Sequence, residues 1–178
     1  MIGNNKNNGF TLIEALVSVA IFSIAITVIA TVFFNTNNLQ QRTKNLQQLQ
    51  NEGRYILDKL AKEIRAREID PALTGDNQEL FFKADEFGEM LGFYYDEDQQ
   101  NLMISSQTGE QDALSAPLNS SAIAVSDIEF FIFPTTNEEA ELRQPMVLIR
   151  LVLKNRINSK LYYQELRLQT AISSKFYK

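Results

Sequence analysis

The most apolar part of the chain is the segment from Phe10 to Phe34. Its 25 residues contain one formally charged side chain, that of Glu14, and apolar residues would lie on all sides of a helix. At about 1.5 Å per residue such a helix is ~38 Å long, which exceeds the ~30 Å hydrocarbon core of a membrane. The pattern therefore predicts a membrane-spanning helix over residues 10–34.

Beyond this segment the sequence becomes polar, but no proline follows until Pro71. Apolar residues then recur at spacings of three and four, which predicts an amphipathic helix with one apolar stripe. A residue before proline is driven out of the α region, so the helix should end near Asp70 and occupy residues 10–68 in all. The stripe consists of Leu46, Leu49, Gly53, Ile56, Leu60 and Ile64.

The amphipathic half of the helix needs one apolar partner. Gly53 lies within its stripe at a cost of about 1 kcal/mol relative to Ala. Lys59 and Glu63 are placed on the polar side, at a spacing that favours an ion pair. The partner is either a β-sheet of the same chain or, for residues 39–67, another helix in a coiled coil. The sheet is the preferred interpretation because strands follow directly.

From Glu79 onward, short runs rich in β-branched and aromatic residues alternate with turn residues. In the run 146–154 every second residue from Val147 to Leu153 is aliphatic, whereas the other face is mixed, as is typical of an antiparallel sheet buried on one side. The polar segments 106–121 and 134–145 are expected to be loops. The predicted strands are 79–83, 91–95, 102–105, 123–133, 146–154 and 160–172, with turns at 98–101 and 155–159.

These patterns predict an α+β fold, in which a long N-terminal α-helix packs on a C-terminal antiparallel β-sheet. The helix divides into a membrane-spanning part, residues 10–34, and an amphipathic continuation, residues 35–70. Residues 71–178 are expected to form a β-rich globular head. With 178 residues and 44% hydrophobic side chains, the chain has material for one modest domain beyond the apolar helix.

Composition excludes several functions. The formal net charge of -5 disfavours nucleic-acid binding. The sequence contains no cysteine and no histidine, so disulfides, thiolate metal sites, cysteine nucleophiles and imidazole bases are absent. No glycine-rich phosphate-binding motif is present either.

Acidic residues cluster at three places in the predicted head. Calcium prefers such oxygen ligands, but none of the clusters has the spacing of the twelve-residue calcium loop. Solvated loop charge is the preferred interpretation, and we assign no catalytic residue, no metal ligand and no cofactor, so the chain is not expected to be an enzyme. The clusters are Asp85-Glu86, Asp96-Glu97-Asp98 and Glu138-Glu139-Glu141.

The beginning of the apolar segment differs from that of a secretory signal peptide. Signal peptides have an apolar region of about 7–15 residues followed by a small-residue cleavage site. Here the apolar region is longer, and the small residue, Gly9, precedes it. An ionised Glu14 at the membrane entrance is costly, so a charged partner is expected. The alternative is an uncleaved anchor in which Glu14 extends to the membrane surface.

The segment from Gly9 to Glu14 has the sequence GFTLIE. Together with its apolar continuation, it resembles the processing site of type IV prepilins and type II secretion pseudopilins. The resemblance implies that a prepilin peptidase cuts after Gly9 and methylates the new amine of Phe10. It further implies that this amine pairs with Glu14 of the preceding subunit, because only good pairing offsets the desolvation of both charges. Major pilins commonly carry Gly and Pro within the segment, whereas this chain has Ser23 and Thr31.

The resemblance also implies partners and a location. Residues 1–9 would be a leader peptide, and its single charge, Lys6, favours retention in the cytoplasm. The protein would then cross the inner membrane once, with its C-terminal domain outside the cytoplasm, before entering a pilus or pseudopilus. Implied partners are the prepilin peptidase/N-methyltransferase, other pilin or pseudopilin subunits, the inner-membrane assembly platform and membrane lipid.

The C-terminal third carries a second resemblance. The run 144–151, followed by a hairpin and by residues 168–172, is similar to the J-class minor pseudopilin of type II secretion. This implies a structural minor subunit at the filament tip that primes assembly. The alternative is a membrane-anchored binding module or adhesin whose β-domain recognises a ligand.

Overall fold

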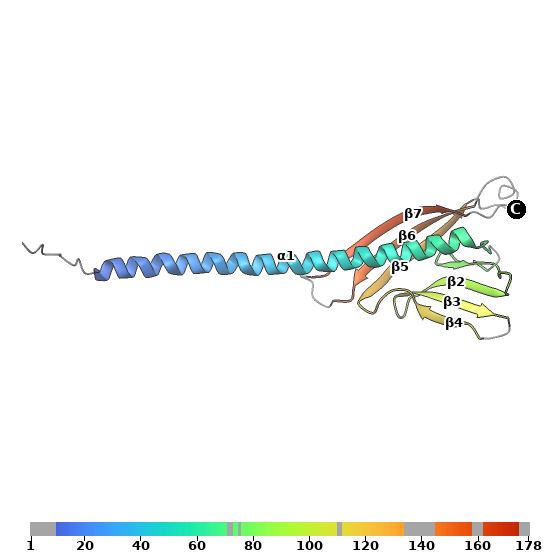
Figure 1. Ribbon diagram of the computed structural model, residues 1–178, viewed down its shortest axis with the longest axis horizontal. Coiled ribbons are helices and arrows are strands. Elements are labelled where there is room, and N and C mark those ends of the chain that lie inside the picture. The colour runs from blue at the N-terminus through green and yellow to red at the C-terminus, as the bar shows by residue number, and fades with distance from the viewer. Residues whose placement is uncertain are drawn as a thin grey trace, which may run out of the picture. The chain divides into compact units, whose positions relative to one another are not determined.

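The computed structural model describes residues 10–70, 73–74, 76–109, 112–133, 145–157 and 162–174. The chain separates into two compact units, Met1–Arg42 and Thr43–Lys178. Helix α1, Leu12–Ala66, begins in the first unit and ends in the second (Figure 1). The predicted helix over residues 10–68 is confirmed, with two fewer residues at each end.

The first unit presents its apolar side chains to the surroundings. The large hydrophobic residues from Phe10 to Phe34 are all at least half exposed. By length and composition, α1 is a helix that can cross a membrane. Four hydroxyl side chains of this unit donate to the carbonyl oxygen four residues earlier at 2.7–2.9 Å, so their donors are satisfied within the helix. These residues are Ser18, Ser23, Thr27 and Thr31.

In the second unit, α1 buries the predicted apolar stripe. Leu49, Gly53, Ile56, Leu60 and Ile64 are buried, as are Val147, Ile149, Leu151 and Leu153 of the facing strand. Leu46, the first residue of the predicted stripe, is 37% exposed, so the buried part of the stripe begins at Leu49. A Cβ on Gly53 would collide with the side chain of Leu168. The glycine therefore lets the helix backbone lie directly against the sheet.

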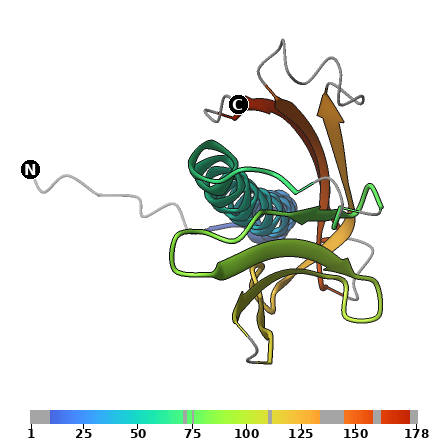
Figure 2. The same cartoon turned by 90° about the vertical axis from the view of Figure 1, so that its right-hand side faces the viewer.

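The strands form two antiparallel sheets rather than the single sheet predicted. The first sheet has the order β1-β2-β3-β4 and the second the order β5-β6-β7. Figure 2 shows the C-terminal part of the helix in the corner between them, and one core cluster contains residues from the helix and both sheets. The strands are β1 Glu79–Phe81, β2 Glu89–Asp96, β3 Asn101–Thr108, β4 Leu114–Pro117, β5 Ile123–Phe133, β6 Met146–Asn155 and β7 Glu165–Ser173.

The predicted strands all correspond to observed ones, with different ends for most. The prediction of a loop over residues 106–121 was wrong, because this range includes the end of β3 and all of β4. Every residue of β4 is exposed, so this strand lacks the alternation that identifies a half-buried strand. The predicted loop 134–145 lies outside the described residues except for Pro145, and the 155–159 turn is described only to Ile157.

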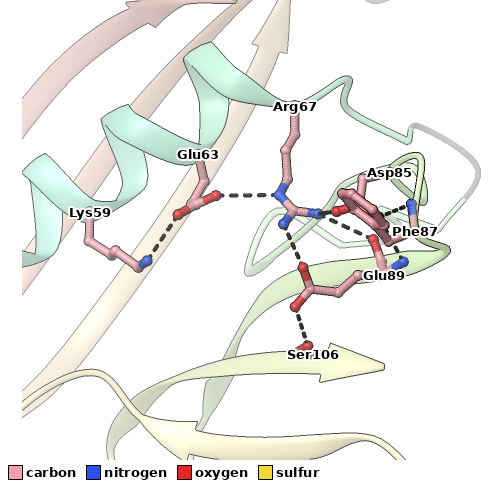
Figure 3. Close-up of polar contacts among 7 residues, drawn as sticks. All are labelled: Lys59, Glu63, Arg67, Asp85, Phe87, Glu89 and Ser106. Carbon is pink, nitrogen blue, oxygen red and sulfur yellow. Dashed lines mark hydrogen bonds and ion pairs between the residues drawn. The ribbon is translucent and has the colours of Figure 1, made fainter. Parts of the chain in front are cut away.

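A cluster of ion pairs attaches the end of α1 to the first sheet (Figure 3). The Arg67 guanidinium lies 2.8 Å from Glu89 Oε2, 3.5 Å from Asp85 Oδ2 and 3.4 Å from Glu63 Oε2. Glu63 is buried, contrary to its predicted place on the polar side, and also forms the predicted pair with Lys59 at 2.9 Å. One arginine thus neutralises acidic groups from the helix and from the β1–β2 region.

The surroundings of Asp85 and Glu89 stabilise their ionised forms. The hydroxyl of Ser106 donates to Glu89 and, together with Arg67, lowers the pKa of Glu89 from its ordinary 4.5. The N–H groups of Glu89 and Phe87, together with the charge of Arg67, lower the pKa of Asp85 from its ordinary 3.8. Groups with lowered folded-state pKa values stabilise the fold above their ordinary pKa values, and this contribution is lost as the pH falls through the folded-state values.

We expect Arg67→Met to lower the free energy of unfolding by about 2 kcal/mol at pH 7, since three carboxylates lose charge-assisted contacts. The deficit should shrink as the pH falls below the ordinary pKa values of Asp85 and Glu89 and then through their lowered folded-state values, because the parent then loses the same contacts. Denaturant titrations of the full chain in detergent at pH 7 and pH 3.5 measure both effects. Arg54→Met, on the exposed face of the same helix, is the control. An equal deficit at both pH values would contradict the electrostatic origin.

Candidate functional site

The candidate site is the start of α1, where the motif residues from Phe10 to Glu14 are described. Phe10 and Thr11 precede the helix, and Glu14 lies in its first turn. The Phe10 side chain is 75% exposed. Gly9, the predicted residue before the cleavage point, lies outside the described residues. The structure therefore places Phe10 and Glu14 at the same helix end, and their predicted roles remain predictions.

Thr11 and Glu14 form a reciprocal N-terminal cap. The main-chain N–H of Glu14 donates to Thr11 Oγ1 at 3.3 Å, and the main-chain N–H of Thr11 donates to Glu14 Oε2 at 3.0 Å. The Thr11 hydroxyl also donates to Glu14 Oε2 at 2.9 Å, while the N–H of Ala15 donates to the Thr11 carbonyl at 3.2 Å. This is a capping box, which satisfies N–H groups that a helix start leaves unpaired.

The cap fixes the direction of the Glu14 carboxylate. Both of its hydrogen-bond donors come from Thr11, so the carboxylate is turned toward the N-terminal end of the helix, where the helix dipole favours negative charge. Within the described part of the chain, Glu14 Oε1 accepts no hydrogen bond, and Glu14 forms no ion pair. The site therefore presents one oriented anion with an open acceptor atom.

We assigned Thr11 no role from the sequence. The signal was present, because Thr followed three residues later by Glu, immediately before an apolar run, is the pattern of a capping box. That spacing would have placed the first helical residue at Leu12, where α1 begins. Glu14 thus has a local structural function in addition to the intersubunit pairing predicted for it.

The acidic clusters in the head make no comparable site. Asp85 accepts main-chain N–H groups and faces Arg67, and Asp96 accepts the N–H of Gln99 at 3.0 Å. Among the residues that the structure describes, no group of three or more acidic side chains is placed to hold a metal ion. The cluster at Glu138-Glu139-Glu141 lies outside the described residues.

Comparison with protein families gives one match. The family described as "Prokaryotic N-terminal methylation motif" matches residues 4–30, which include Gly9, the capping box and most of the apolar segment. Searches of curated proteins and of solved structures returned no significant match. The matched region thus includes the site built above from Phe10, Thr11 and Glu14.

We expect Thr11→Val to destabilise the first turn of α1, because the valine removes the hydroxyl but keeps the size of the side chain. Loss of an N-cap costs about 1 kcal/mol, so amide exchange at residues 13–15 should accelerate about fivefold in the detergent-solubilised full chain. Thr31→Val is the matched control, since its hydroxyl bonds to Thr27 within the helix. Exchange in the first turn that does not differ between the two variants would show that the capping box contributes no stability.

Proposed function

Because the chain carries the N-terminal methylation motif of type IV prepilin-like and pseudopilin proteins, we propose that it is a minor subunit of a type IV pilus or of a secretion or competence pseudopilus. Proteins of this family are structural, so the chain is not an enzyme, and the motif implies processing by prepilin peptidase and assembly with other pilins. The observation that carries the proposal is the motif's single carboxylate, Glu14, oriented at the start of an exposed apolar helix.

In the first proposed step, a prepilin peptidase hydrolyses the Gly9–Phe10 peptide bond. Residues 1–9 are released as the leader, and the amine of Phe10 becomes the new N-terminus and is N-methylated. Before processing, the helix anchors the protein in the inner membrane with residues 10–34 in the lipid. The single cation of the leader, Lys6, supports a cytoplasmic leader, with residues 71–178 forming the globular head on the other side.

In the second step, the Phe10 amine of an incoming subunit pairs with Glu14 of the preceding subunit. A cation and an anion brought into apolar surroundings are each penalised by desolvation, and pairing removes much of that penalty. Thr11 occupies Oε2 of Glu14, which leaves Oε1 for the incoming amine. The pairing sets the axial register, and the apolar side chains of residues 10–34 then pack against neighbouring helices. The inner-membrane assembly platform would extract the subunit from the lipid.

The position within the filament rests on the C-terminal third. The run 144–151 and residues 168–172 are similar to the J-class minor pseudopilin, and in the structure they contribute to the adjacent strands β6 and β7. We therefore assign the subunit to the filament tip, where it primes assembly together with other minor subunits. In purified filaments we therefore expect a low copy number of this subunit relative to the major subunit.

The decisive test is the intact mass and N-terminal sequence of the full chain expressed beside a prepilin peptidase. We expect a mature chain that begins at N-methylated Phe10, and we expect Gly9→Val to block cleavage. Gly3→Val, in the same leader, is the control and should be processed normally. An uncleaved parent chain would overturn the proposal and would indicate a plain anchor whose β-domain holds the function.

We expect Glu14→Ala to leave cleavage largely intact, because the cut lies five residues earlier, but to impair methylation or incorporation into filaments. Loss of one ion pair in apolar surroundings should reduce incorporation at least about tenfold. Quantitative immunoblotting of sheared filaments, normalised to the membrane fraction, measures this. Normal incorporation of the variant would contradict the pairing mechanism while leaving the processing class intact.

A further inference from the structure

The two sheets of the head have four outer strand edges, and three of them are protected. The β1 edge pairs with the segment after the helix, through the Ile69–Phe82 bridge and the bond from Asp70 N–H to the Phe81 carbonyl at 2.9 Å. The β4 edge has only four residues and ends at Pro117. Short edges and prolines are devices that prevent further strand pairing.

The third edge, that of β5, is covered by the other sheet. A bulge interrupts β5 between Val125 and Asp127. The N–H of Val125 donates to the Gln100 carbonyl at 2.9 Å, and the hydroxyl of Tyr95 donates to the Val125 carbonyl at 3.1 Å. Further along, the N–H of Phe130 donates to the Asn77 carbonyl at 2.6 Å. At these positions the first sheet and its flanking segments therefore occupy the outer edge of β5.

The β7 edge has none of these protections. It is nine residues long and lies at the margin of its sheet, with β6 between it and β5 (Figure 1). Two bonds flanking the strand establish which residues face β6: Ser174 N–H to the Pro145 carbonyl at 2.8 Å and Asn155 N–H to the Gln164 carbonyl at 3.3 Å. Because main-chain groups alternate in direction along an antiparallel strand, the even-numbered residues face β6 and the odd-numbered ones, 165 to 173, point away.

The outward main-chain groups of β7 are unpaired. Within the described residues, no main-chain hydrogen bond forms on the outer side of Glu165–Ser173. The side chains of the same odd-numbered residues are all exposed, and no proline or glycine interrupts the strand. This row of unpaired N–H and carbonyl groups is the feature on which an additional strand pairs.

The apolar face of the sheet is also incomplete at this edge. On the side that faces the helix, the aliphatic residues of the central strand β6 are fully buried. On the same side of β7, Leu166 and Leu168 are only partly buried, although they pack against the core cluster. A further strand beside β7 would cover these two leucines with its own apolar residues at every second position.

We propose that β7 is the site at which an extended segment of a neighbouring filament subunit adds a fourth strand to the β5-β6-β7 sheet. The inference rests on the proposed function, which brings subunit heads together. The matching segment has aliphatic residues at alternate positions, next to Leu166 and Leu168, and polar residues between them. Arg167 forms an ion pair with Glu165 at 2.8 Å and its side chain is still 80% exposed, so an acidic residue among the latter can share this cation.

The contact is heterologous, with β7 on one subunit and a different segment on the next. Two copies of β7 paired with each other would form a closed, two-fold dimer, in which both edges are used up. An open filament instead requires two different complementary surfaces on neighbouring subunits. The added segment is accordingly not β7 itself.

The first test compares amide exchange in the detergent-solubilised mature chain with that in the native filaments of the producing cells. On assembly, the amides of residues 167, 169 and 171 should slow at least about tenfold, whereas those of residues 166, 168 and 170, already bonded to β6, should change little. Odd-numbered amides that still exchange rapidly in filaments containing the subunit would overturn the proposal. This measurement uses the unmodified chain and requires no variant.

The second test uses Gln169→Pro, which removes one outward N–H without removing a bond to β6, and the matched control Gln169→Ala, which keeps that N–H. Both variants should be cleaved and methylated like the parent, but only the proline variant should lose incorporation, by about tenfold. Equal incorporation of both variants would overturn the proposal. Failed processing of the parent chain would instead refute the proposed function, so the two failures are distinguishable.

The absence of cysteine from the sequence allows a test of the partner. With Gln169→Cys as the only thiol, oxidation of the purified chain should give no disulfide-linked homodimer, because β7 does not pair with β7. A homodimer formed in high yield would overturn the heterologous assignment and identify a second copy as the occupant.

Discussion

A single carboxylate in an apolar helix is the constraint on which the rest of this protein depends. Glu14 is the only charged side chain between Phe10 and Phe34, and burial of an unpaired charge in lipid or in a helical bundle is costly. The chain meets part of this cost locally, through the two hydrogen bonds from Thr11. The remainder calls for a cation, and under the proposed processing the new amine of Phe10 would supply one at the same end of the helix.

The long helix passes through two environments, and its composition changes between them. Its first part has exposed apolar side chains on every side, and the hydroxyls of Ser18, Ser23, Thr27 and Thr31 are bonded to helix carbonyls. Its second part buries one stripe against the sheets, with Gly53 permitting direct contact between the helix backbone and Leu168. The same element thus serves as an anchor over one part and as the centre of a folded head over the other, which is the arrangement expected of a subunit that passes from membrane to filament.

Within the head, polar contacts connect elements that the hydrophobic core alone does not fix. Arg67 joins the end of the helix to the β1–β2 region through Glu63, Asp85 and Glu89. Hydrogen bonds of Val125 and Tyr95 connect the second sheet to the first. The edge of β7 is left out of this arrangement, so the head is well closed on three strand edges and open on the fourth. An edge of this kind is a hazard for a monomer but a functional surface for a protein that assembles.

Local patterns in the sequence determined the apolar helix, the buried stripe from Leu49 to Ile64, the limits of β5 and the motif around Glu14. Each of these depends on periodicity or on neighbouring residues. The capping box could also be predicted from the sequence, since Thr11 and Glu14 are three residues apart. Only the tertiary structure decided the existence of the exposed strand β4, the division into two sheets, the burial of Glu63 beside Arg67, and the open edge of β7. Those features depend on which distant segments pair and on what covers them, and periodicity along one segment carries no information about its partners in space.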